Sequence, residues 1–166
     1  MSEEFMLLPA SMLHQQSLIE IRKCNDYTSV YGLRLSESDI KLLVENRKES
    51  LASNGRIEFG GGVIDKLIME FANSPYIQQD NYVSKIQELQ ETFYYFKNET
   101  LDELGDDEII RLMKQYFDTE CQGSTEYLQS TVVEKISRKI RFGNIAYGEP
   151  DVNEDVNDDL NEDEML

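Results

Sequence analysis

One stretch of the chain decides its fold: Asp80 to Thr100, which reads D-N-Y-V-S-K-I-Q-E-L-Q-E-T-F-Y-Y-F-K-N-E-T. Apolar side chains recur in it at the spacing of one helix face, at Tyr82, Ile86, Leu89, Phe93 and Phe96. The run Phe93-Tyr94-Tyr95-Phe96 covers most of the helix circumference, because successive helical residues are about 100° apart. We therefore expect a buried central helix against which the other helices pack.

The rest of the chain up to Phe142 repeats this helical pattern in shorter segments. Apolar residues at helical spacing predict helices over about 9–23, 36–54, 63–73, 105–117 and 124–142. Only Arg56 to Phe59 alternates in the manner of a strand, and a piece this short cannot establish a sheet. The sequence predicts an all-α fold, an irregular or orthogonal bundle of about five or six helices around residues 80–100, with little or no strand.

Polar residues mark where several of these helices begin. Ser36 and Asp39 have the spacing of a capping box, and Ser124 precedes the last helix. Asp80 is the expected N-cap of the central helix. The polar run 25–29 is expected to connect the first two helices.

Charge divides the chain into two parts. The net charge of the chain is −17. Residues Glu149 to Leu166 contain nine acidic side chains and no basic one, so about half of this charge lies in them. We expect a single globular domain over 1–148 and a disordered acidic tail over 149–166. General binding of nucleic acid or of an anionic membrane is not expected, because phosphate contacts need Lys and Arg.

The N-terminus and the cysteines favour a cytoplasmic protein. The chain begins with an acidic Met-Ser-Glu-Glu, whereas a secretory signal begins with basic residues. Its two cysteines, Cys24 and Cys121, have no spacing that indicates a disulfide framework or a zinc site.

The residue types that catalysis needs are scarce. His14 is the single histidine. To act as the base that activates the Cys121 thiol it would have to lie beside it, and nothing in the sequence indicates that it does. A calcium-loop match in the acidic tail has Val156 where glycine is required. We therefore expect no catalytic residues, no metal site and no cofactor; this favours a protein that is not an enzyme and leaves the enzyme alternative open.

The glycine run is the main candidate for ligand binding. Gly60, Gly61 and Gly62 lead into a helix whose free amide groups could bind an anion, with Arg56 and Lys66 nearby. The spacing does not match a P-loop, since Lys66 is followed by leucine. The alternative is a glycine loop that only allows close packing.

Two further groups are candidates for interaction. Lys135, Arg138 and Lys139 share one face of the last helix, where the acidic tail could bind in competition with an acidic partner, or where they simply complement the helix dipole. Tyr94 and Tyr95 cannot both face inward with Phe93 and Phe96, so one of them is either covered by the last helix or exposed for binding.

Five runs stand together in order: Tyr31–Ser36 (YGLRLS), Gly55–Gly60 (GRIEFG), Asn73–Ile77 (NSPYI), Phe93–Thr100 (FYYFKNET) and Cys121–Leu128 (CQGSTEYL). Over about residues 29–143 they resemble an uncharacterised family of small single-domain proteins from clostridia and related Gram-positive bacteria. The resemblance implies a bacterial, cytoplasmic protein of one domain, and it implies no activity and no catalytic residues.

These observations favour a cytoplasmic protein-interaction or regulatory module whose partner is another protein. The alternative is a binder of a small molecule or phosphate ligand at the glycine run, or an enzyme that acts on such a ligand. A third hypothesis, an acidic mimic of nucleic acid, would need the charge arranged along one folded face, whereas much of it lies in the tail.

Overall fold

The computed structural model describes residues 10–58 and 62–142, and every regular element in them is a helix, as predicted. The main helices are α2 (Ala10–Thr28), α3 (Glu37–Ser53), α4 (Ile64–Phe71), α5 (Tyr82–Glu99) and α6 (Asp106–Asp118). The last helix has three parts: α7 (Thr125–Tyr127), the π-helical η3 (Leu128–Val133) and α8 (Glu134–Arg141). Two short 3-10 turns are η1 (Ser29–Tyr31) and η2 (Gln79–Asn81).

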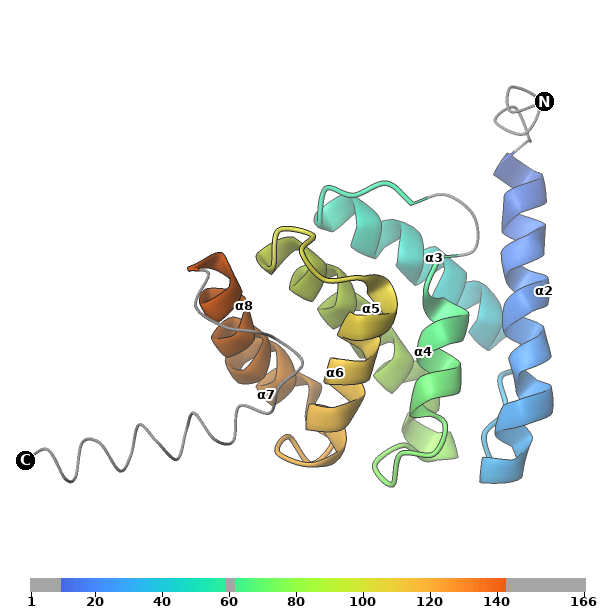
Figure 1. Ribbon diagram of the computed structural model, residues 1–166. Helices are drawn as coiled ribbons and strands as arrows, with labels where there is room; N and C mark the ends of the chain where they lie inside the picture. The colour runs from blue at the N-terminus through green and yellow to red at the C-terminus, as the bar shows by residue number, and fades with distance from the viewer. Residues whose placement is uncertain (1–9, 59–61, 143–166) are drawn as a thin grey trace, which may run out of the picture.

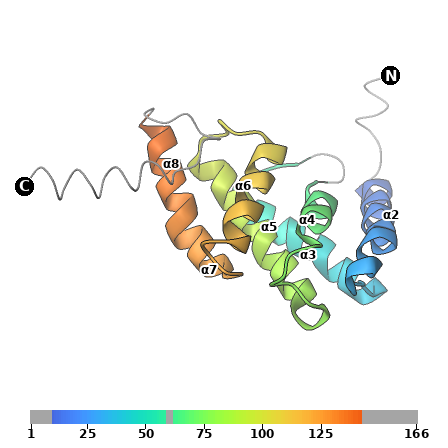
Figure 2. The same ribbon diagram turned by 60° about the horizontal axis from the view of Figure 1, so that its bottom comes forward.

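The helices lie in two layers (Figures 1 and 2). Helices α2, α4 and α6 stand side by side in one layer, and α3, α5 and the last helix form the other. Consecutive helices alternate between the layers, so the chain forms three helix pairs placed next to one another. Helix α5 contacts α3, α4, α6 and all three parts of the last helix, which confirms its central position.

One face of α5 supplies the core between the layers. All five residues of the predicted stripe are at most 1% exposed: Tyr82, Ile86, Leu89, Phe93 and Phe96. They pack in one continuous cluster with the apolar faces of the other helices. Removing such side chains from water is the main favourable contribution to folding.

The other two faces of α5 are polar and hydrogen-bonded. Toward α3 and the residues after it, the pairs are Gln90–Asn46, Glu91–Ser50 and Tyr94–Glu58. Toward the last helix, the pairs are Lys85–Gly123, Glu88–Thr125, Thr92–Gln129, Tyr95–Glu134 and Glu99–Arg141. Buried polar groups need such partners, so these bonds fix how α5 is rotated between its neighbours.

The π-helical part keeps the last helix in register with α5. Between Thr92 and Tyr95, α5 advances three residues, whereas their partners Gln129 and Glu134 are five residues apart. A π-helical turn holds more residues than an α-helical one, so η3 accommodates the surplus residues between Gln129 and Glu134.

Helix α2 extends through the run 25–29 that was predicted to be a connection, so that prediction is wrong over Asn25 to Thr28. The side chain of Asn25 both donates to and accepts from the backbone of Leu35, at 3.0 and 2.8 Å. The hydroxyl of Thr28 donates to the carbonyl of Leu33 at 2.9 Å. These polar side chains thus provide hydrogen-bond partners for backbone groups of the following loop. Because they bond to that loop and not to their own backbone, they do not end the helix.

Two of the predicted helix starts are confirmed and one is wrong. Ser36 and Asp39 form the reciprocal capping box, and the hydroxyl of Ser124 caps the last helix. Asp80 is not the cap of the central helix, because it lies inside η2 and α5 begins only at Tyr82.

Candidate functional site

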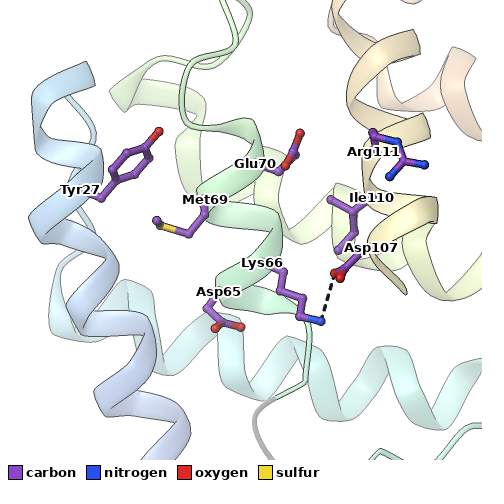
Figure 3. Close-up of a pocket in the computed structure, with 8 residues that line it drawn as sticks. All are labelled: Tyr27, Asp65, Lys66, Met69, Glu70, Asp107, Ile110 and Arg111. Carbon is purple, nitrogen blue, oxygen red and sulfur yellow. Dashed lines mark ion pairs between the residues drawn. The ribbon is translucent and has the colours of Figure 1, made fainter. Parts of the chain in front are cut away.

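A groove runs over α4, between α2 and α6. It is open to solvent and has a volume of about 530 Å³. Figure 3 shows the side chains that line it, which are Tyr27 from α2, Asp65, Lys66, Met69 and Glu70 from α4, and Asp107, Ile110 and Arg111 from α6.

The amphipathic sequence of α4 places four of these residues in the groove. Its other face carries residues that are fully buried in the core: Ile64, Leu67, Ile68 and Phe71. Their spacing of three and four residues turns Asp65, Lys66, Met69 and Glu70 outward. Because α4 has only 8 residues, against 19 in α2 and 13 in α6, longer helices flank it on both sides.

The groove combines one closed ion pair with unpaired charges. The Lys66 ammonium lies 3.2 Å from the Asp107 carboxylate, which joins α4 to α6. Asp65, Glu70 and Arg111 form no ion pair with any described residue. Within the described part of the chain, two carboxylates and one guanidinium of the groove are thus without an ion-pair partner, so the acidic groups are in excess.

Apolar groups are exposed beside these charges. Tyr27 is 41% exposed and Met69 is 42% exposed. The ring of Tyr27 contacts the ring of Tyr31 edge to face, with 5.6 Å between the ring centroids. The hydrogen bond between their hydroxyl groups raises the pKa of Tyr27, and the Glu70 carboxylate contributes in the same direction. The groove thus offers both apolar contact and acidic groups.

The two cations proposed for an anion site each have a carboxylate partner. The Arg56 guanidinium donates to the Asn98 side chain at 2.6 Å and to Asp102 at 2.8 Å. Lys66 pairs with Asp107 in the groove. Arg56 therefore joins the segment after α3 to the end of α5, and an anion would have to compete with both carboxylates.

Part of the glycine run lies outside the described residues, namely Gly60 and Gly61. Gly62 has a φ of +77°, and a Cβ built on it would lie 2.6 Å from Arg47 Nε and from Glu58 Oε1. Arg47 and Glu58 form an ion pair with 2.9 Å between these two atoms. Gly62 therefore packs directly on the pair, which supports a packing role for it, and anion binding at this run stays a prediction.

The two tyrosines of the aromatic run are both covered. Tyr94 is 1% exposed, and its hydroxyl donates to Glu58 at 2.6 Å. Tyr95 is half-buried, and its hydroxyl donates to Glu134 of the last helix. Tyr95 thus contacts the last helix through its hydroxyl, Tyr94 is buried, and a role of either residue in binding a partner stays a prediction. A second open hollow, of about 450 Å³, lies beside Tyr95 and η3.

These contacts predict late ionisation of Tyr95. The hydrogen bond to Glu134 raises its pKa from 10.0 to about 12, and burial raises that of Tyr82 to about 12. Burial also raises the pKa of Tyr94. Because the protonated phenol is the form that the fold favours, this stabilisation is complete below pH 10 and is lost as the pH rises toward 12.

The measurement is an absorbance titration of tyrosinate on the intact chain and on two variants. Tyr95→Phe should remove one late-ionising group. Glu134→Gln should move the ionisation of Tyr95 to lower pH, because the anionic acceptor is lost. Identical late titrations in Glu134→Gln and the intact chain would contradict the assignment.

The basic residues of α8 differ in their surroundings. Arg138 is exposed, Lys135 and Lys139 are half-buried, and the Arg141 guanidinium donates to Glu99 at 2.9 Å. The acidic tail predicted to bind this face lies outside the described residues, as does the predicted domain boundary. Binding of the tail to α8 therefore stays a prediction.

The cysteines and the histidine do not form a reactive group in the described structure. Burial raises the pKa of Cys24 to about 11 and that of Cys121 to about 12, so both thiols stay protonated at neutral pH. His14 lies on α2, whereas Cys121 lies between α6 and α7. No three His, Cys, Asp or Glu side chains among residues 10–58 and 62–142 are placed to hold a metal ion. In the same residues, no helix combines the length and the apolar character needed to cross a bilayer.

Sequence reasoning missed most of this groove. Of its eight lining residues it singled out only Lys66, and it placed Tyr27 in a connection. The outward residues Asp65, Met69 and Glu70 were readable from the periodicity of α4. Their position between α2 and α6 depends on contacts between helices that are far apart in the sequence.

The comparisons with known proteins return one match. The family described as "Family of unknown function (DUF6323)" matches residues 20–146, a range that includes all lining residues of the groove. No curated protein matches the chain, and no solved structure does.

Proposed function

Since the chain belongs to the DUF6323 family, whose function is unknown, we propose a function from the geometry of the groove. The protein is a non-enzymatic interaction module, and the groove over α4 binds a helical segment of another protein that carries both basic and apolar side chains. The observation that carries this proposal is a pair of carboxylates that have no cationic partner among the described residues and lie beside exposed apolar groups, in a groove flanked by two longer helices.

The shape of the groove suits a helix. A partner helix about 10 Å wide can lie over the short α4, with α2 and α6 on either side. Amphipathic helices bind in such grooves through apolar side chains on one face. Tyr27 and Met69 offer exposed apolar surface for these contacts, and aromatic residues and methionine are enriched in protein interfaces.

The charges specify which helix fits. Asp65 and Glu70 have no cationic partner among the described residues, so Lys or Arg side chains of the partner can pair with them. The net charge of −17 favours the approach of a basic segment from solution. By contrast, the hollow beside η3 has Tyr95 already bonded to Glu134 and Gln129 to Thr92. The groove over α4 is therefore the better candidate.

The experiment uses a designed probe, an amphipathic helical peptide of Leu and Lys, labelled for fluorescence anisotropy. Glu70→Lys is expected to weaken its binding by about tenfold, because an attractive contact becomes a repulsive one. The matched control is Glu49→Lys, which makes the same change in net charge at an exposed position of α3. This control should change the affinity by less than about twofold at physiological salt, where distant charges are screened.

Two outcomes would refute the proposal. One is an equal loss of affinity in Glu70→Lys and Glu49→Lys, which would mean that the peptide responds only to overall charge. The other is the absence of peptide-induced NMR shift changes at Tyr27, Met69 and Ile110. A pull-down at low and high salt then tests natural partners, which the intact chain and Glu49→Lys should retain and Glu70→Lys should lose.

A further inference from the structure

A second surface of the molecule is the outer face of α2. This helix stands at the end of its layer, with α3 and α4 on one side and no described element on the other (Figures 1 and 2). The buried residues of α2 share the inner face: Ser17, Leu18, Ile21, Cys24, Asn25 and Thr28. None of the residues in 10–58 and 62–142 is shown to cover the opposite face, where Met12 and Ile19 are exposed.

Apolar side chains form a stripe on this outer face. Met12 is 54% exposed, Ile19 is 45% exposed, and Val30, which follows in η1, is 75% exposed. Ile19 lies about two helical turns after Met12, and Val30 lies about three turns after Ile19, so all three share nearly one line. An open hollow of about 660 Å³ runs beside Met12 and Ile19. The end helix of a layered array normally needs a polar outer face, and this one is partly apolar.

The charges on this face are self-complementary. Glu20 and Lys23 both line the hollow, and neither forms an ion pair with a described residue. Two identical α2 helices can pack antiparallel with Met12 opposite Val30 of the second copy. The same register places Ile19 opposite the aliphatic part of the second copy's Lys23 side chain. In this register Glu20 lies next to the second copy's Lys23, and the reverse contact forms by symmetry.

We infer that the outer faces of α2 from two copies of this chain pack against each other, antiparallel, to form a two-fold symmetric dimer. The layer α6–α4–α2 then continues into the same layer of the second copy. This inference does not rest on the groove, whose lining shares no residue with the hollow beside Met12 and Ile19.

The dimer is weak and depends on salt. Helix α2 has 19 residues and is therefore about 28 Å long, and a single helix face of this length provides less than the ~800 Å² per partner of a standard interface. Each chain also carries a net charge of −17, so two copies repel each other until salt screens the charge. We expect association at micromolar to millimolar concentration that strengthens from about 0.05 to about 0.5 M salt.

Sedimentation equilibrium of the full chain tests the inference. The mass should rise from monomer toward dimer with concentration, and more so at high salt. Ile19→Glu should hold the chain monomeric, because it buries a charge at the centre of the contact. The matched control is Leu42→Glu, the same change at a residue of α3 that is 49% exposed, and it should leave dimerisation unchanged. Circular dichroism should show that both variants fold.

A charge-reversal pair then tests the register. Glu20→Lys alone and Lys23→Glu alone should each weaken the dimer by about tenfold, because each places like charges together. Mixing the two variants should restore association, because every contact across the axis then pairs opposite charges. A monomer at all concentrations and salts, an equal loss in Leu42→Glu, or no restoration on mixing would overturn the inference.

Discussion

Phe93→Ala is expected to lower the free energy of unfolding by about 3–5 kcal/mol, the range observed for removing a buried aromatic side chain. Phe93 is 1% exposed and lies in the core between the two helix layers. Its ring also contacts the ring of Tyr94 edge to face, with 5.2 Å between the centroids. At this chain length the midpoint of thermal unfolding should fall by about 10 °C.

Urea unfolding followed by circular dichroism measures this effect. The control is Phe142→Ala, the same change at the end of α8, where the side chain is 72% exposed. It should cost less than about 0.5 kcal/mol, as surface substitutions do. If both variants lost the same stability, the aromatic run would not be the core of the fold.

Gly123→Ala is expected to lower the free energy of unfolding by about 2–4 kcal/mol, for two reasons that add. The backbone of Gly123 has a φ of +84°, which a residue with a Cβ adopts only with strain. A Cβ there would also lie 2.5 Å from the Cβ of Tyr76, which belongs to the loop between α4 and α5. The turn at Gly123 follows the end of α6. In it, the Gly123 amide donates to the Phe117 carbonyl at 2.8 Å.

Gly32→Ala separates the two reasons. Gly32 has a φ of +79°, and nothing lies within 4 Å of the position of its added Cβ. This control should therefore show only the backbone strain, about 1 kcal/mol. Denaturation curves with equal losses for the two variants would mean that the close approach to Tyr76 contributes nothing.

The groove and the proposed dimer contact both involve residues of α2. Tyr27, near the end of α2, lines the groove, whereas Ile19 and Lys23 line a separate hollow. The two proposed contacts therefore use different residues of α2. If both proposals hold, the dimer presents two grooves, and a bivalent partner gains avidity without any new contact.

Local sequence patterns determined the elements and their inner faces. The stripe from Tyr82 to Phe96, the capping box at Ser36 and the acidic start of α6 are all read from residues within a few turns of one another. Periodicity and capping depend only on residues close in sequence, so both can be predicted without knowing the fold. The buried face of α4 was predictable for the same reason.

Tertiary structure alone decided how the helices are combined. Asn25 and Thr28 continue α2 because they bond to a loop that comes later in the chain, and this brings Tyr27 to the groove. The cations Arg56 and Lys66, close in sequence, pair with carboxylates on different elements. The π-helical turn of η3 keeps the side chains of the last helix aligned with their hydrogen-bond partners on α5. Each of these features depends on contacts between residues distant in sequence, and a local pattern carries no information about such contacts.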